Sequence, residues 1–205
     1  PCGTWSALRY IKPGPDVVRK LPAHVKGIPR SDGSLPRNVR EANAMLDHAI
    51  AIVRTGHAHG AGALFESAVS RDANSPHAIC GREDHASMWT YPALITLARD
   101  LRMQGVAFDQ CRTDLKWQKT TYLLATPGLV DHVRGEFQAL VCNHPGGHKR
   151  MAGAMREDST FPSEESAEYT ADMCLRIATA LDRWIEEKPV NVSVAHAENH
   201  PLADW

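Results

Sequence analysis

The chain has 205 residues, a length that suits one domain with a full-sized hydrophobic core. Hydrophobic residues make up 43% and charged residues 23%, which is ordinary for a globular protein, and a net charge of −1 excludes a global basic field that would attract nucleic acid. The sequence shows neither an export leader nor an apolar run of the roughly 18 residues that a membrane span needs. Five scattered cysteines favour a reducing, intracellular location over a disulfide scaffold.

Helical and strand patterns alternate along the chain after a loop rich in Pro, Gly and basic residues at 7–37. Asn38 and Glu41 resemble a capping box at the start of a first helix, and Gly56 is expected to end it. Further helices are predicted at 91–103, at 129–137 and from about 164 to 188. Short apolar runs predict strands at 63–66, 106–108, 122–125 and 140–142.

This alternation predicts an α/β domain over residues 1–188, built on a doubly wound, mostly parallel sheet of Rossmann-like type with an antiparallel hairpin. Residues 189–205 are expected to form a polar C-terminal tail. Sites in such sheets gather beyond the carboxyl ends of the strands. Glu66 is expected at the carboxyl end of an interior strand, close to Cys2.

Several short motifs together supply a thiol, a carboxyl group and a cation, the groups that a covalent catalytic site needs. Pro1-Cys2-Gly3-Thr4 presents a thiol, Leu64-Phe65-Glu66-Ser67 ends in an acid, and the hairpin at 108–123 contributes Lys116, Gln118 and Lys119. Each motif also has a non-catalytic interpretation. The cysteine can be inert, the acid can cap the following loop, and the hairpin residues can form a solvated turn.

In this order the motifs resemble the catalytic half of DNA (cytosine-5) methyltransferases, above all the divergent methyltransferase-like proteins of phages and mobile elements. The resemblance implies that Cys2 attacks carbon 6 of a flipped-out cytosine and that Glu66 holds the ring. It also implies that Lys116, Gln118 and Lys119 contact DNA and that S-adenosylmethionine supplies the methyl group. The family's glycine-rich cofactor turn precedes its Pro-Cys motif, so the resemblance is to a truncated or degenerate copy whose cofactor-binding segment is largely missing from this chain.

A second interpretation from a different class is a non-catalytic nucleic-acid-binding or structural domain of a mobile-element polyprotein. The first interpretation names DNA as the partner, the second allows a nucleic acid or a purely structural role, and both leave the oligomeric state open. Ser67 and Ala68 stand where the family has asparagine and proline, which is consistent with a degenerate copy.

A separate group of metal-ligating residues lies in the segment Cys142-Asn143-His144-Pro145-Gly146-Gly147-His148. Cys142, His144 and His148 can supply three zinc ligands, with Cys111 or Cys80 as candidates for the fourth. The spacing matches no standard zinc finger. We therefore expect no metal here but a Gly/Pro turn whose histidines face solvent or phosphate, and zinc binding is the alternative.

Overall fold

The structure is a computed structural model of the whole chain. It describes Trp5, 16–113, Trp117, 119–145, His148 and 169–188. The described helices and strands are α1 (Arg37–Ala58), β1 (Leu64–Ala68), the 3₁₀ helix η3 (Met88–Thr90), α2 (Pro92–Asp100), β2 (Gln104–Asp109), the 3₁₀ helix η4 (Gln110–Thr113), β3 (Thr120–Ala125), α3 (Leu129–Phe137) and α4 (Ala171–Glu187).

The three strands form one sheet in the order β1-β3-β2, and both strand pairs are antiparallel. Glu66 pairs with Leu123 on one side of β3, while Phe108 pairs with Thr121 on the other. The predicted doubly wound, mostly parallel sheet is therefore wrong. The segments that form β1, β2 and β3 were predicted as strands, but β3 folds back between β1 and β2 and is antiparallel to each.

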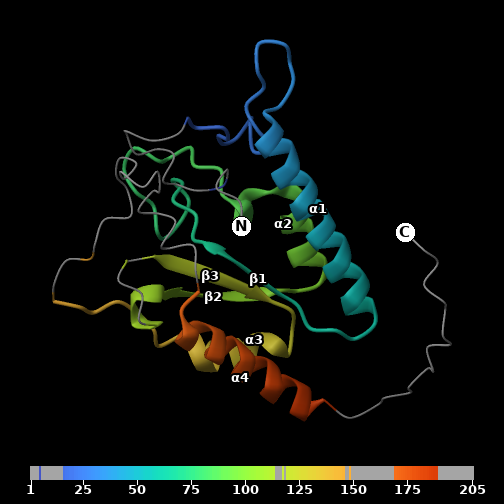
Figure 1. Cartoon of the computed structure of the whole chain (residues 1–205), viewed down its shortest axis with the longest axis vertical. Helices are drawn as coiled ribbons and strands as arrows, with labels where there is room; N and C mark the ends of the chain where they lie inside the picture. Colours follow the sequence, from blue (N-terminus) through green and yellow to red (C-terminus); the bar gives the residue numbers. More distant parts are fainter. Residues whose placement is uncertain are drawn as a thin grey trace.

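Helices cover both faces of the sheet (Figure 1). The alternation of side chains along β3 shows why: Leu123 packs in one core with α3 and α4, and the next residue, Leu124, packs in the other with α1 and α2. A strand that is buried on both faces reads as a continuous apolar run, so β3 was recognisable as a strand although its direction was not.

The predicted ends of two helices need correction. α1 begins at Arg37 after Pro36, without a side-chain cap, and continues past Gly56 to Ala58. A glycine near a helix end lowers helix propensity but does not by itself stop the helix. The last helix begins at Ala171, where Thr170 caps it by accepting a hydrogen bond from the Met173 N–H at 3.2 Å.

Two predictions about strands also fail. Residues 140–142 are loop and form no strand, although the Leu140 carbonyl accepts a hydrogen bond from the Asp109 N–H. Glu66 lies in the middle of β1, which is an outer strand of the three-stranded sheet, rather than at the end of an interior strand.

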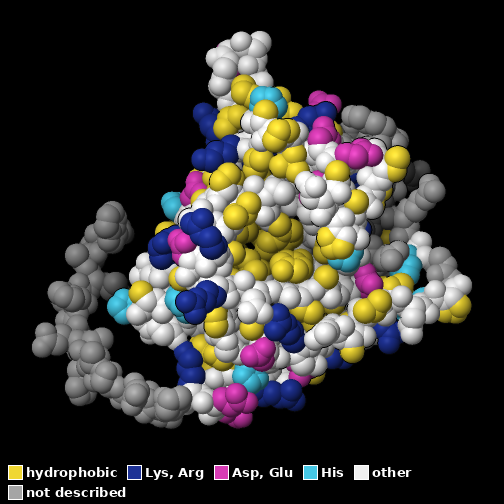
Figure 2. Space-filling view, turned by 180° about the vertical axis from the view of Figure 1, so that it is seen from behind, with side chains coloured by type: hydrophobic (Ala, Val, Ile, Leu, Met, Phe, Trp, Pro, Cys, Tyr) yellow, Lys and Arg dark blue, Asp and Glu magenta, His cyan; other side chains and the backbone are white. Residues whose placement is uncertain are grey.

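The surface of the described part combines an apolar hollow with charged surroundings. On the side opposite to Figure 1, hydrophobic side chains gather in a central hollow and Lys and Arg side chains lie around it (Figure 2). Among the helices that the structure describes, none combines the length and the apolarity needed to cross a membrane.

Candidate metal centre

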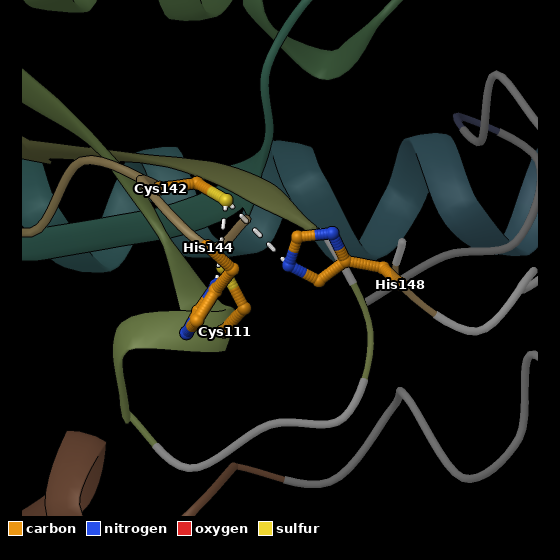
Figure 3. A group of neighbouring side chains, drawn as sticks. All are labelled: Cys111, Cys142, His144 and His148. Atoms are coloured by element: carbon orange, nitrogen blue, oxygen red, sulfur yellow. Dashed lines mark hydrogen bonds between the residues drawn. The ribbon is translucent and has the colours of Figure 1, made fainter. Parts of the chain in front are cut away.

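Four metal-ligating side chains converge beside the end of β2 (Figure 3). Cys111 comes from η4, directly after β2, and Cys142, His144 and His148 come from the segment after α3. One ligand atom from each side chain lies within 4.8 Å of all the others. The three candidate ligands named from the sequence therefore lie together, and the structure assigns the fourth position to Cys111.

Backbone and side-chain hydrogen bonds hold the two segments against each other. The Asp109 N–H donates to the Leu140 carbonyl at 2.8 Å, and the Cys142 N–H donates to Asp109 Oδ2 at 2.9 Å. Arg112, which follows Cys111, donates a hydrogen bond from its guanidinium group to Oδ1 of Asn143, which follows Cys142, at 2.8 Å. These bonds flank Cys111 and Cys142, so the two thiols are brought together by contacts that need no metal.

Two of the distances between ligand atoms match those around a tetrahedral zinc ion. Cys142 Sγ lies 3.5 Å from His144 Nδ1 and 3.5 Å from His148 Nε2. Zinc binds sulfur at about 2.3 Å and nitrogen at about 2.0 Å, which at a tetrahedral angle separates sulfur from nitrogen by about 3.5 Å. The two imidazole rings meet edge to face, with centroids 5.2 Å apart.

Burial differs between the two cysteines that are candidates for the fourth metal ligand. Cys111 is buried, Cys142 is half-buried, and Cys80, the other candidate for the fourth ligand, is exposed outside the cluster. Burial, reinforced by the neighbouring Cys142 thiol, raises the pKa of Cys111 to about 12. Cys111 is therefore not expected to act as a free nucleophile at neutral pH.

A second polar group forms around Glu66, where sequence analysis expected catalysis. Lys119 Nζ lies 3.9 Å from Glu66 Oε1, and the Tyr169 hydroxyl donates to Glu66 Oε2 at 2.6 Å. Glu66 Oε1 is buried without a hydrogen-bond partner. Burial lowers the pKa of Lys119, with Glu66 opposing this shift, and burial together with the Glu66 hydrogen bond raises the pKa of Tyr169.

The predicted site residues thus fall into three groups. Glu66 and Lys119 lie together, and Cys142, His144 and His148 lie together. Cys2, Lys116 and Gln118 lie outside the described residues. Tyr169, which was not among the predicted site residues, precedes α4 and donates a hydrogen bond to Glu66.

Comparisons of the chain with protein-family models, with curated proteins and with solved structures found no match.

Proposed function

We propose that the chain is a zinc-binding domain in which Cys111, Cys142, His144 and His148 hold one structural Zn²⁺. The observation that carries this proposal is the convergence of two thiols and two imidazoles within 4.8 Å. Two sulfur and two nitrogen ligands in a tetrahedral arrangement suit zinc, and four protein ligands leave no open position for substrate or water.

The proposed role of the ion is to join the end of the β2–β3 hairpin to the segment that follows α3. The hydrogen bonds of Asp109 already align these two segments. A shared ion would link them further, because it would be coordinated by one thiolate from each segment. Ion binding of this kind contributes directly to folding free energy, because the ligand set is not assembled in the unfolded chain.

Metal analysis of the chain purified from zinc-supplemented cells tests this proposal. We expect one zinc per chain by elemental analysis, retained through gel filtration and released by a strong chelator. Iron at one equivalent with a visible charge-transfer spectrum, or no metal under zinc-saturated conditions, would contradict it.

A second candidate function rests on the proximity of Glu66 and Lys119. These residues are 3.9 Å apart, and a carboxyl group beside a cation suits the ring-holding role that the methyltransferase resemblance implies. We therefore retain, as a proposal, S-adenosylmethionine-dependent methyl transfer to cytosine in DNA, with Cys2 as nucleophile. The observed polar group is equally able to serve as an anchor of Tyr169 on β1.

A trapping experiment separates these two roles. With the complete protein loaded with S-adenosylmethionine, a duplex containing 5-fluorocytosine should form an adduct that survives denaturing electrophoresis. After methyl transfer, carbon 5 carries fluorine and has no proton to lose, so the bond between the thiolate and carbon 6 is not released. Cys2→Ser should abolish the adduct, whereas Cys174→Ser, an exposed position on α4, should not. Absence of an adduct with the cofactor-loaded protein would leave Glu66 with an anchoring role only.

A further inference from the structure

The two cysteine ligands of the metal centre differ in how easily a small molecule reaches them. Cys142 is half-buried and lies in the segment after α3, with its sulfur 3.5 Å from Nδ1 of the exposed His144. Cys111 is buried in η4. Oxidation of cysteine follows exposure as well as thiolate character. A small oxidant in the solvent therefore reaches the Cys142 sulfur first, while burial protects the Cys111 sulfur from direct attack.

The sulfur atoms of Cys111 and Cys142 are close enough to react with each other (Figure 3). The ligand atoms of the centre all lie within 4.8 Å of one another, and these two sulfurs are among them. A disulfide joins two sulfurs at about 2.05 Å, so the two atoms have to approach by less than about 2.8 Å. Cys142 belongs to a loop, and rotation of its side chain or a shift of this loop can supply that approach.

Zinc would hold both cysteines in the form that reacts. A metal binds cysteine as the thiolate, and the thiolate is also the form that attacks peroxides and disulfides. Cys111, which is not expected to be a free nucleophile at neutral pH, would thus be a thiolate for as long as it binds the ion. The inference below therefore rests on the proposed zinc centre and concerns its regulation.

We propose that Cys142 is the site at which a hydroperoxide oxidises this protein, and that Cys111 completes the reaction by forming a disulfide, with release of the zinc ion. First, the Cys142 thiolate attacks one peroxide oxygen, the O–O bond breaks, and the hydroxide that leaves takes up a proton. The Cys111 thiolate then attacks the sulfur of the Cys142 sulfenic acid, and a second hydroxide leaves and is protonated to water. The two sulfurs lose two electrons in total, and the peroxide gains them.

The disulfide changes how the two segments are joined. It removes both thiolates from the metal, and the two imidazoles of His144 and His148 that remain bind zinc far more weakly than four ligands do. The bond between Cys111 and Cys142 keeps the end of the β2–β3 hairpin attached to the segment after α3. His144 and His148, in contrast, lose the ion that held them to it. A thiol reductant reverses the reaction by thiol–disulfide exchange.

Addition of hydrogen peroxide to the zinc-loaded full chain tests the proposal. A chromophoric chelator measures the released zinc, and mass spectrometry of a non-reduced digest identifies the disulfide. We expect one zinc released for each disulfide formed between Cys111 and Cys142, and dithiothreitol with added zinc should restore the metal content. Cys80→Ser and Cys174→Ser, which change exposed cysteines outside the ligand group, should release zinc at the wild-type rate.

Cys111→Ser separates the two oxidation steps. With zinc in excess, this variant still offers Cys142 to the peroxide, but it lacks the thiolate that attacks the sulfenic acid. We expect complete loss of the disulfide, and dimedone, which reacts with sulfenic acids, should label Cys142 in the variant more strongly than in the wild type. Equal labelling of the two proteins would contradict the role of Cys111.

The remaining outcomes distinguish this proposal from the metal centre itself. Zinc that stays bound after Cys80 and Cys174 have been oxidised overturns the proposal and leaves the metal centre intact. Zinc release without a disulfide between Cys111 and Cys142 does the same. A chain that holds no zinc before peroxide is added overturns the metal centre and, with it, this proposal.

Discussion

Replacing Cys142 with serine is expected to abolish tight zinc binding and to destabilise the end of the β2–β3 hairpin. Cys142 is the central ligand of the cluster, with its sulfur 3.5 Å from both histidine ligand atoms. Even residues that only support a metal ligand change affinity by about 10- to 100-fold, so loss of a ligand should weaken binding by at least about 100-fold. Competition with a chromophoric chelator measures the affinity.

The stability change follows from the same binding equilibrium. Zinc at about 1,000 times its Kd stabilises a folded chain by about 4 kcal/mol, and the variant should lose most of this increment. Cys174→Ser is the matched control, because Cys174 is an exposed cysteine on α4 outside the ligand group. If both variants bind zinc as the wild type does, the four-residue centre is wrong.

Phe137→Ala should produce a large loss of stability of a different origin. Phe137 is fully buried at the end of α3, and its ring packs against Phe108 of β2 with centroids 4.6 Å apart. Removing a buried phenyl ring leaves a cavity, and the free energy of unfolding should fall by about 3–5 kcal/mol in urea denaturation.

An exposed apolar residue on the other helix of this layer supplies the comparison. Ile185 of α4 is 58% exposed, so Ile185→Ala should change the free energy of unfolding by less than about 0.5 kcal/mol. Equal effects of the two substitutions would show that α3 does not pack on the sheet as described.

The sequence predicted the helices and strands better than their arrangement. The apolar periodicity of each segment records which faces are buried, and this was enough to find α2, α3 and the three strands. It does not record strand partners. β1 and β2 run in the same direction, as the strand–helix–strand pattern suggested. They do not pair with each other, because β3 lies between them and pairs with each in the antiparallel sense.

The sequence indicated only those ligands of the metal centre that lie close together in the chain. Three ligands lie within seven residues, so the spacing of Cys142, His144 and His148 indicated a shared site. The choice between Cys111 and Cys80 depends on the hydrogen bonds of Asp109 with the segment after α3, which link residues about 30 positions apart. No local pattern contains that information.

X-ray absorption at the zinc edge tests the four-ligand centre most directly. For the zinc-loaded chain we predict two sulfur atoms at about 2.3 Å and two imidazole nitrogens at about 2.0 Å. Cys111→Ser should reduce the sulfur contribution to one, and Cys80→Ser should leave the spectrum unchanged. A zinc shell of oxygen and nitrogen alone, or one that retains two sulfurs in Cys111→Ser, would contradict the metal centre described above.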